Sequence, residues 1–484
     1  MNDLQITYIR NQILIMPMKV NQDLTYKNKK FNKRSDYNGI IKYVDKFLDG
    51  ENLNRFLVLP GLRDVGKTTI LYQVYEYLLM EKNISPQNCL YVSCDRLKKS
   101  GNVDIFEVVN YYCETYHNSI IETLSQPVFI FIDETQHDKN WASNGKLIFD
   151  ASKNIFMILS GSSALKLSNN PDAARRLLNM SNYPLTYSQH LKLKYGNFKN
   201  DISDLLIQMI FDGKTENSVE IERKILNIYT NIQNYDVYEW KNFLQFGGFP
   251  SSLHEDNNEI TKKIIDMVEK VVTTDLNTIE GINRDTEDLA FRILNYFAFQ
   301  NPGEVSVGSL SNLFDAKKQL VTKVLNLLEK TQLIFHIESF TSSVKRTTKP
   351  HEYFFATPSI KHVLALDVGN AILEDETAYF GKLLENYVAS SFHDLDNKNN
   401  ISYKIYYDDS KKKTKDTNVD FIVQRGLEKP IPIEVSCGDK DDKQIKRAIS
   451  KYHSPYGIVI SNTTSNIVKK DNIIYIPPEI FAFM

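Results

Sequence analysis

The string Gly-Leu-Arg-Asp-Val-Gly-Lys-Thr, from Gly61 to Thr68, constrains the fold of this chain more than any other feature. It follows a short apolar run, Arg55 to Leu59, and precedes Thr69 to Met80, where apolar residues recur at helical spacing. The predicted order is strand, glycine loop, helix, which is the context that the G-x-x-x-x-G-K-[ST] motif requires. The alternative is an ordinary glycine turn, but then the match of the motif together with a flanking strand and helix would be a coincidence.

This loop predicts a binding site for a nucleoside triphosphate, with ATP as the expected one. Gly61 and Gly66 let the backbone turn so that its N–H groups face phosphates at a helix N-terminus. We expect Lys67 to contact the β- and γ-phosphates and Thr68 to hold Mg²⁺. The other residues expected to line the nucleotide are Arg63, Asp64, Val65 and Thr69.

A second strand signal, Val128 to Asp133 (VFIFID), ends in the acidic pair Asp133 and Glu134. The carboxyl ends of parallel strands are where ligands sit in an α/β sheet. Asp133 therefore suits the Mg²⁺ shell, and Glu134 suits polarising the attacking water. Such a pair also caps helices, and only its combination with the phosphate loop favours the catalytic interpretation.

Two further groups are candidates for the same site. The run Ile155 to Ser160 predicts another strand, and its terminal Ser160 could sense the γ-phosphate, although Ser-Gly-Ser-Ser at 160–163 is also an ordinary turn sequence. Arg175 and Arg176 follow, and an arginine supplied by a neighbouring subunit stabilises the transferring phosphate in related reactions. A role in surface ion pairs is an equal alternative for both arginines.

Length and composition bound the remaining architecture. The chain has 484 residues, too many for one hydrophobic core, and is 42% hydrophobic and 24% charged, as expected of a soluble globular protein. The short apolar run Ile13 to Met18 has no cleavable small-residue site behind it, so we expect no secretory signal and a cytoplasmic location. No apolar run approaches a membrane span, so we expect no membrane embedding. The net charge of −2 gives no global signature of nucleic-acid binding.

Several motifs together resemble a family of predicted ATPases of bacteria and archaea, and more widely the STAND-type archaeal ATPases. The family combines an AAA-type P-loop domain, a winged helix and a C-terminal restriction-endonuclease-like domain, and the resemblance implies an oligomer that binds and hydrolyses ATP. The matching segments are GLRDVGKTT at Gly61, FIDETQ at Phe131, LSGSSA at Leu159, YPLTYSQHL at Tyr183, GGFP at Gly247 and VVTTDL at Val271.

The predicted fold class is therefore α/β: a parallel P-loop NTPase sheet, a helical lid, a winged helix and a second α/β domain. The apolar periodicity and the breaks between segments suggest the boundaries. The expected parts are an N-terminal extension (1–39), the AAA-type domain (40–200), a helical lid or connector (201–285), the winged helix (286–365) and a degenerate restriction-endonuclease-like domain (366–484).

The last domain is similar to the PD-(D/E)xK nuclease core. Glu385 on a predicted helix, with Asp420 and Glu434 on predicted strands, are candidates for a second metal site. The lysine expected two residues after the second acid is replaced by Ser436, so we expect weak or absent nuclease activity. Lys440 or Lys443 could compensate; otherwise the acids are a relic of the fold.

The expected partner is double-stranded DNA, bound through the winged helix. Lys317, Lys318 and Lys323 offer a face for phosphate contacts, although winged helices also serve as packing modules. The leading hypothesis is an oligomeric AAA-type ATPase that acts on DNA or a DNA-associated complex. The alternatives are an ATP-switched signalling or scaffold protein, whose C-terminal domain binds other proteins, and an ATP-dependent nuclease.

Overall fold

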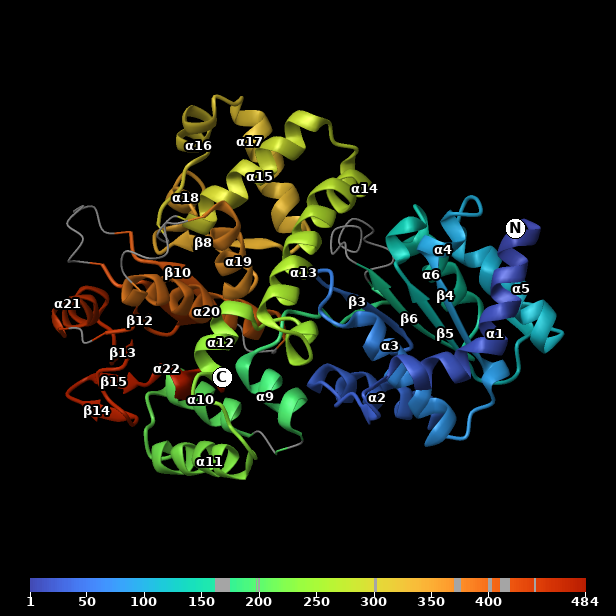
Figure 1. The fold of residues 1–484 in the computed structure, drawn as a ribbon, viewed down its shortest axis with the longest axis horizontal. Helices are drawn as coiled ribbons and strands as arrows, with labels where there is room; N and C mark the ends of the chain where they lie inside the picture. The colour runs from blue at the N-terminus through green and yellow to red at the C-terminus, as the bar shows by residue number, and fades with distance from the viewer. Residues whose placement is uncertain are drawn as a thin grey trace. The chain divides into compact units, whose positions relative to one another are not determined.

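The computed structural model describes residues 1–161, 175–196, 198, 201–299, 303–369, 376–398, 403–409, 418–438 and 441–484. The chain divides into two compact units (Figure 1). Unit 1 comprises Met1–Tyr183 and Thr273–Gly281, and unit 2 comprises Pro184–Val272 and Ile282–Met484. The chain therefore passes from one unit to the other three times.

Unit 1 is built on a five-stranded parallel sheet with the order β4-β5-β6-β3-β7. Its strands are β3 (Phe56–Pro60), β4 (Cys89–Ser93), β5 (Val128–Asp133), β6 (Ile155–Gly161) and β7 (Leu178–Asn179). The predicted parallel sheet is thus confirmed. Because β6 lies between β3 and β5, the phosphate loop, Ser160 and Asp133 come to the same edge of the sheet.

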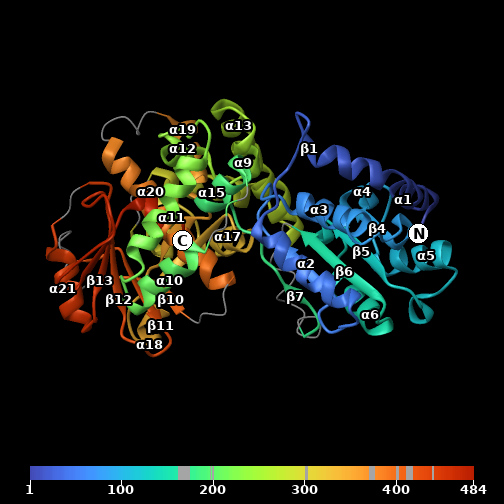
Figure 2. The ribbon, with the colours of Figure 1, turned by 90° about the horizontal axis from the view of Figure 1, so that it is seen from below.

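Helices cover both faces of this sheet (Figure 2). On β3, Phe56 and Val58 belong to one apolar cluster and Leu57 and Leu59 to the other, as the alternation of side chains along a strand requires. The first cluster includes residues of α5 (Ile105–His117) and α6 (Trp141–Ala151), and the second includes residues of α2 (Ser35–Leu48) and α3 (Lys67–Met80). The short α4 (Cys94–Lys98) follows β4.

Helix α1 (Asp3–Asp23) is packed into unit 1. Its residues Ile9 and Ile13 lie in the first apolar cluster, and Met16 and Val20 lie in the second. The small hairpin β1 (Thr25–Tyr26) and β2 (Lys29–Lys30) follows. The region expected to be an N-terminal extension therefore contributes to the core of the nucleotide-binding unit.

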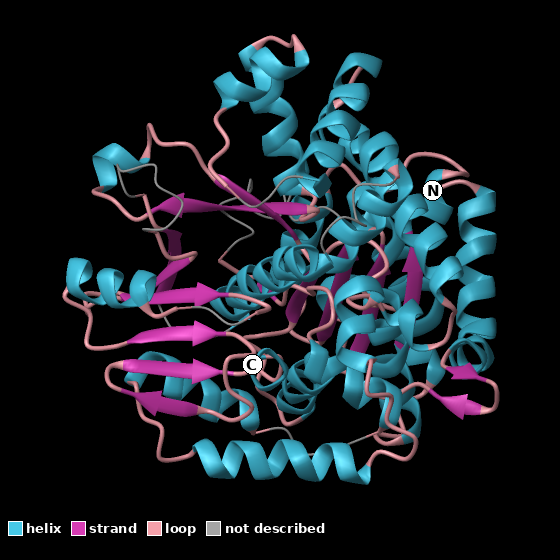
Figure 3. Ribbon diagram, turned by 60° about the vertical axis from the view of Figure 1, so that its left-hand side comes forward, coloured by secondary structure: helices cyan, strands magenta, loops and turns pink. Residues whose placement is uncertain are grey.

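Unit 2 contains a mixed sheet, whose strands are drawn in magenta in Figure 3. It has eight strands in the order β14-β15-β13-β12-β11-β10-β8-β9. The hairpin of β8 and β9, which falls within the segment expected to be a winged helix, pairs through β8 with β10 in parallel and so belongs to the C-terminal sheet. The strands are β8 (Ile334–Ser339), β9 (Glu352–Phe355), β10 (Tyr403–Tyr407), β11 (Phe421–Arg425), β12 (Ile431–Val435), β13 (Gly457–Ile460), β14 (Val468–Lys470) and β15 (Ile473–Ile476).

The helices of unit 2 include the three that precede this hairpin, α15 (Arg284–Phe299), α16 (Val307–Phe314) and α17 (Lys318–Lys330). The others are α9 (Tyr187–Tyr195), α10 (Ile202–Asp212), α11 (Ser218–Asn231), α12 (Glu239–Phe246), α13 (Asn257–Lys270), α18 (Ser343–Arg346), α19 (Pro358–Val368), α20 (Glu376–Lys398), α21 (Lys443–Tyr452) and α22 (Pro478–Phe481). Among the described residues, no helix is both long and apolar enough to traverse a membrane.

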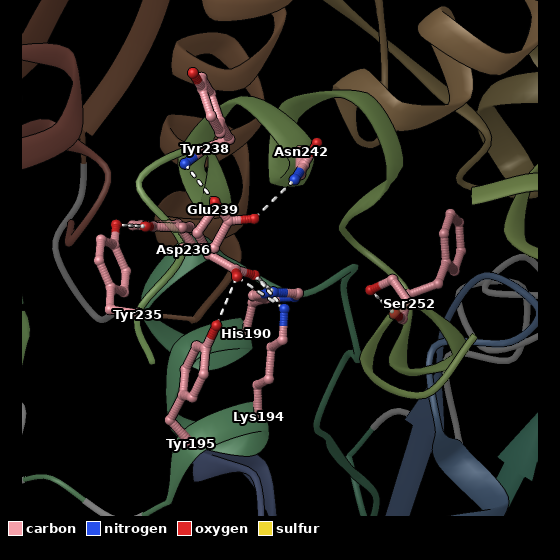
Figure 4. Close-up of polar contacts among 11 residues, drawn as sticks. His190, Lys194, Tyr195, Tyr235, Asp236, Tyr238, Glu239, Asn242 and Ser252 are labelled. Carbon is pink, nitrogen blue, oxygen red and sulfur yellow. Dashed lines mark hydrogen bonds and ion pairs between the residues drawn. The ribbon is translucent and has the colours of Figure 1, made fainter. Parts of the chain in front are cut away.

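A buried carboxylate joins α9 to α12 (Figure 4). Glu239 accepts hydrogen bonds from His190 Nε2 at 2.7 Å, from Lys194 Nζ at 2.8 Å and from the Tyr195 hydroxyl at 2.7 Å. Burial alone would raise the pKa of Glu239, but these hydrogen bonds outweigh it and lower the pKa to about 2. The ionised carboxylate of Glu239 thus holds α9, the first helix of unit 2, against the start of α12.

Candidate nucleotide site

Backbone geometry explains the two glycines of the phosphate loop. Gly66 precedes α3 with φ at 94°, a conformation that favours glycine. A Cβ on Gly61 would lie 2.3 Å from the carbonyl oxygen of Asn182, so only glycine fits beside the segment after β7. Both positions therefore require glycine, Gly66 because of its backbone conformation and Gly61 because of the close approach of Asn182.

The ammonium group of Lys67 lies over this loop. Its Nζ donates to the carbonyl oxygens of Gly61 at 2.9 Å and Leu62 at 2.7 Å. Burial lowers the pKa of Lys67, and the carboxylates of Glu134 and Asp133 oppose that shift. The lysine is thus held at the start of α3, where the motif predicts contacts with phosphate. Thr69, in the same helical turn, is half-buried.

Arg34, which the motif did not predict, supports the loop from outside. Its Nη1 donates to the carbonyl oxygen of Val65 at 2.6 Å, and its Nη2 donates to that of Tyr183 at 3.0 Å. The guanidinium is buried and lies 3.2 Å from the carboxylate of Asp36. Arg34 therefore ties the loop to the segment that follows β7. Arg34 lies 27 residues before Gly61 and outside the motif, so the sequence pattern gave no indication of this role.

Asp133 is the centre of the polar network at the sheet edge. Its Oδ2 accepts hydrogen bonds from Thr68 Oγ1 at 2.7 Å and from the Tyr91 hydroxyl at 2.9 Å. Its Oδ1 accepts one from Ser160 Oγ. The threonine hydroxyl and the aspartate carboxylate predicted for Mg²⁺ are therefore adjacent, and oxygen donors are the ligands that this ion prefers. Tyr91, in the middle of β4, was not predicted from the sequence.

Glu134 lies next to this network in a left-handed backbone conformation, with φ at 54°. Its backbone N–H donates to Asp133 Oδ1 at 3.0 Å. Burial raises the pKa of Glu134, as does the charge of Asp133, whereas Lys67 and Arg63 lower it. A carboxylate with a raised pKa is a stronger proton acceptor than an ordinary glutamate, which suits the polarisation of water.

Arg63 lies in the same loop but contacts a distant segment. Its Nε and Nη2 donate to Asp275 Oδ2 and Oδ1, at 2.8 and 2.6 Å. Asp275 ends the π-helical turn Val271–Asp275 and precedes α14 (Leu276–Glu280). The VVTTDL motif thus places a buried acid against the phosphate loop, a contact that the sequence did not reveal. Asp64, the next residue after Arg63, is exposed with φ at 62°.

The structure distinguishes the two candidate arginines. Arg176 Nε donates to Asp150 at 2.6 Å, an ion pair at the surface of unit 1. Arg175 is exposed. Ser162 and Ser163 lie outside the described residues. Ser160 is described, and its hydroxyl donates a hydrogen bond to Asp133 Oδ1.

The structure brings together two of the three acids of the proposed nuclease-like centre. Phe421 pairs with Ile433 across adjacent antiparallel strands, so Asp420 and Glu434 lie opposite one another. Asp420 accepts from the backbone N–H of Val435 at 2.6 Å.

The third acid, Glu385, lies on α20, where its charge acts on the buried Lys361. In the described part of the chain, Glu385, Asp420 and Glu434 do not form a group whose ligand oxygens all lie within 4.8 Å of one another.

The residues that could replace the missing lysine of that centre are also placed. Ser436 Oγ exchanges hydrogen bonds with the backbone of Gly438, at 3.2 Å, and so faces its own turn. Lys443 pairs with Asp441 at 2.8 Å. Lys440 lies outside the described residues. Of the two candidate lysines, the described one, Lys443, is thus paired with an acid two residues before it.

Comparison with known proteins gives three family matches. Residues 53–191 match an AAA domain. Residues 237–370 and 380–481 match two domains of unknown function, DUF8612 and DUF4143. The AAA match covers the phosphate loop, the acidic strand and Ser160, so the site described above lies within it.

Relatives and solved structures were also found. The uncharacterized protein MJ1637 of Methanocaldococcus jannaschii is 31% identical over 97% of this chain and 92% of its own length. The uncharacterized protein MJ1544 of the same organism is 24% identical over 60% of this chain and 58% of its own length.

Among solved structures, the Aeropyrum pernix ORC1 protein in complex with DNA has 12% identity, a TM-score of 0.31 and coverage of 71% of this chain and 96% of that one. C. elegans PCH-2 has 13% identity, a TM-score of 0.25 and coverage of 64% and 72%. Such TM-scores indicate little overall structural agreement.

The sheet order, the phosphate loop and the AAA match agree on the nature of unit 1. It carries an AAA-type, ATP-binding P-loop domain. The similarity to MJ1637 extends over nearly all of both chains. This chain contains an AAA domain with the phosphate loop and acidic strand of an ATPase, and it belongs to the same family as the uncharacterized protein MJ1637 of Methanocaldococcus jannaschii.

Proposed function

We propose that this ATPase is a cytoplasmic, oligomeric enzyme that hydrolyses ATP with Mg²⁺ and uses the energy on DNA or a DNA-associated complex. One observation carries the catalytic part of the proposal. The two carboxylate oxygens of Asp133 bond the hydroxyls of Thr68 and Ser160, and Glu134 follows directly in the chain. The groups that bind a metal, contact the γ-phosphate and activate water are thus within one network.

Each residue then has a defined task. Thr68 and Asp133 would hold Mg²⁺, which neutralises charge on the β- and γ-phosphates when bound. Lys67 and the N–H groups at the start of α3 bind the phosphate oxygens. Glu134 orients a water molecule and accepts its proton, while the hydrogen bond from its own N–H to Asp133 fixes its backbone. Ser160, on β6 next to β5, positions Asp133 by donating a hydrogen bond to its Oδ1.

The oligomeric part of the proposal rests on Arg175. An exposed arginine that follows the sensor strand is available to a neighbouring subunit, whereas Arg176 is held by Asp150 of its own chain. An arginine supplied in trans stabilises the charge of the transferring phosphate. We therefore assign Arg175 this role in preference to Arg176.

The DNA part of the proposal rests on the segment before the β8–β9 hairpin. Lys317 and Lys318 are exposed at the N-terminus of α17, where a basic side chain can reach a phosphate backbone. Lys323 lies within the same helix. Three helices followed by a hairpin is the order that a winged helix requires, which supports this assignment.

A second candidate, an ATP-controlled switch, is favoured by the Arg63–Asp275 pair. Residues 273–281 belong to unit 1, although the chain on both sides belongs to unit 2. A nucleotide-dependent movement of the phosphate loop would therefore act on residues 273–281, which are joined at both ends to the chain of unit 2. Slow turnover and tight nucleotide retention are expected of such a switch.

Steady-state ATP hydrolysis with and without duplex DNA separates the two candidates. The proposal predicts turnover that DNA stimulates and that Glu134→Gln slows by about 100-fold or more, while nucleotide binding persists. Glu269→Gln, an exposed acid of α13, is the matched control and should hydrolyse ATP normally. Nucleotide that stays bound without turnover, at a rate that DNA does not change, would favour the switch instead.

A further inference from the structure

Three potential metal ligands share one face of the β8–β9 hairpin in unit 2. His336 and Glu338 are two residues apart on β8, so their side chains point to the same face. Ile337 pairs with Glu352 across the antiparallel ladder, which places His351 opposite Glu338. The register of the hairpin, and not sequence proximity alone, therefore brings two imidazoles and a carboxylate together.

The side chains are close enough to share one ion. One ligand atom from each of His336, Glu338 and His351 lies within 4.8 Å of the others. Among the described histidines, cysteines, aspartates and glutamates, these three form the group that meets this limit. The rings of His336 and His351 are stacked, with centroids 4.1 Å apart and planes 9° apart. All three residues are half-buried, so an ion could enter from solvent.

The surrounding contacts hold this group in position. The backbone of His351 exchanges two hydrogen bonds with Val305, at 2.8 and 3.3 Å. The Nδ1 of His336 is bonded to the carboxylate of Glu329, which leaves Nε2 for a metal. A carboxylate on the second nitrogen is the usual companion of a metal-binding histidine, since it fixes the ring and raises its basicity.

One cation already lies near the group. Arg346 Nη1 is 3.6 Å from Glu338 Oε2, too far for a good hydrogen bond. The guanidinium is held mainly elsewhere, because Nη2 donates to the carbonyl oxygen of Thr341 at 3.0 Å and the group stacks on the Tyr406 ring. Glu338 can therefore turn to an ion without leaving Arg346 unpartnered.

We propose that His336, Glu338 and His351 bind a divalent transition-metal ion of the Zn²⁺ type, with Glu329 as a positioning residue. Two imidazoles and one carboxylate form a borderline donor set that suits Zn²⁺ or Co²⁺ better than Mg²⁺ or Ca²⁺. Three protein ligands leave a fourth position for water. The ion would join the two strands of the hairpin on the side opposite the buried apolar residues of β8.

Metal binding by the full-length, chelator-treated and tag-free protein tests this proposal. Co²⁺ absorption and Zn²⁺ calorimetry should show one ion per chain, with the intense visible bands of a tetrahedral site. His336→Asn and His351→Asn should abolish those bands, and Glu329→Gln should weaken affinity by about 10- to 100-fold. His453→Asn is the matched control, because His453 is exposed and Asn tolerates its left-handed conformation.

Two results would overturn the proposal. The first is folded wild-type protein, checked by circular dichroism, that binds neither Zn²⁺ nor Co²⁺. The second is tetrahedral Co²⁺ binding that persists in folded His336→Asn and His351→Asn proteins. Unchanged affinity in Glu329→Gln would remove the positioning role of Glu329 alone. ATP hydrolysis by the same variants should match the wild type, since the phosphate loop is in the other unit.

Discussion

Arg63 of the phosphate loop and Asp275 of the π-helical turn form a bidentate ion pair, although they are 212 residues apart in the chain. Asp275 is nearly buried, with a side chain 5% exposed, and Arg63 is 22% exposed. The charge of Glu134 also acts on Arg63, after that of Asp275. Arg63 is therefore linked both to Glu134, the residue proposed to activate water, and to a segment that lies outside the AAA match.

We predict that Arg63→Gln and Asp275→Asn each weaken ATP binding and that the double variant is little worse than the worse single one. Both changes release the same contact, so their effects should be non-additive by about 0.5–3 kcal/mol in a double-mutant cycle. Calorimetry of ATP binding measures the cycle. The exposed pair Arg425–Glu428 is the control and should show no coupling to ATP. Additive effects at Arg63 and Asp275 would contradict the prediction.

Glu239 predicts a specific dependence of stability on pH. Its folded pKa of about 2 lies below its ordinary value of 4.5, so the ionised form is favoured by folding. The resulting stability is fully present above pH 4.5 and is lost as the pH falls from there through about 2. Glu239→Gln should destabilise unit 2 at neutral pH by about 2–3 kcal/mol, because hydrogen bonds to a charge are lost.

Thermal unfolding between neutral and acidic pH tests this statement. The difference between wild type and Glu239→Gln should shrink as the pH falls below the ordinary pKa of a glutamate. Glu269→Gln, exposed on α13, should unfold like the wild type at every pH. A difference that stays constant down to the lowest pH would show that the charge of Glu239 is not what stabilises α9 and α12.

Local sequence patterns predicted three strands of the parallel sheet and the residues that lie at its edge. The apolar runs ending at Leu59, Asp133 and Ser160 became β3, β5 and β6, because parallel strands buried on both faces are apolar throughout. The motif placed Lys67 and Thr68 correctly at the start of α3. These features depend on residues that are neighbours in the chain, so periodicity and spacing were sufficient.

Contacts between distant segments could not be predicted in this way. Nothing in the periodicity indicates that β8 pairs with β10, that Asp275 reaches Arg63, or that Tyr91 bonds Asp133. The burial of α1 was missed for the same reason. Its apolar positions face the two cores only because β4 and α3 provide a surface for it. Such pairings depend on the assembled sheet, which a single sequence does not encode in any local signal.

The proposed DNA contact makes a prediction about charge. Lys317→Ala with Lys318→Ala should weaken duplex binding and reduce its salt dependence, since each phosphate contact releases a counterion. Lys262→Ala, exposed on α13, is the control for a general loss of positive charge. Fluorescence anisotropy at several salt concentrations measures both quantities. Equal affinity and an unchanged salt slope would exclude this face as the DNA contact.

The absence of a lysine at position 436 predicts that nuclease activity is weak or absent. Ser436 faces the backbone of Gly438 and carries no positive charge to assist an attacking water. Plasmid DNA incubated with the purified protein and Mg²⁺ or Mn²⁺ should therefore stay intact. Cleavage that Asp420→Ala abolishes would contradict this. Cleavage gained by Ser436→Lys would instead show a centre that lacks only its lysine.

The central claim is that the network of Lys67, Thr68, Asp133 and Glu134 is the one ATP-hydrolysing centre of this protein. Phosphate release from Mg²⁺-ATP measures it most directly, with wild type, Lys67→Ala and Glu134→Gln compared. We predict turnover by the wild type, loss of binding and hydrolysis in Lys67→Ala, and binding with hydrolysis slowed by about 100-fold or more in Glu134→Gln. Hydrolysis at the wild-type rate by Lys67→Ala would contradict the account.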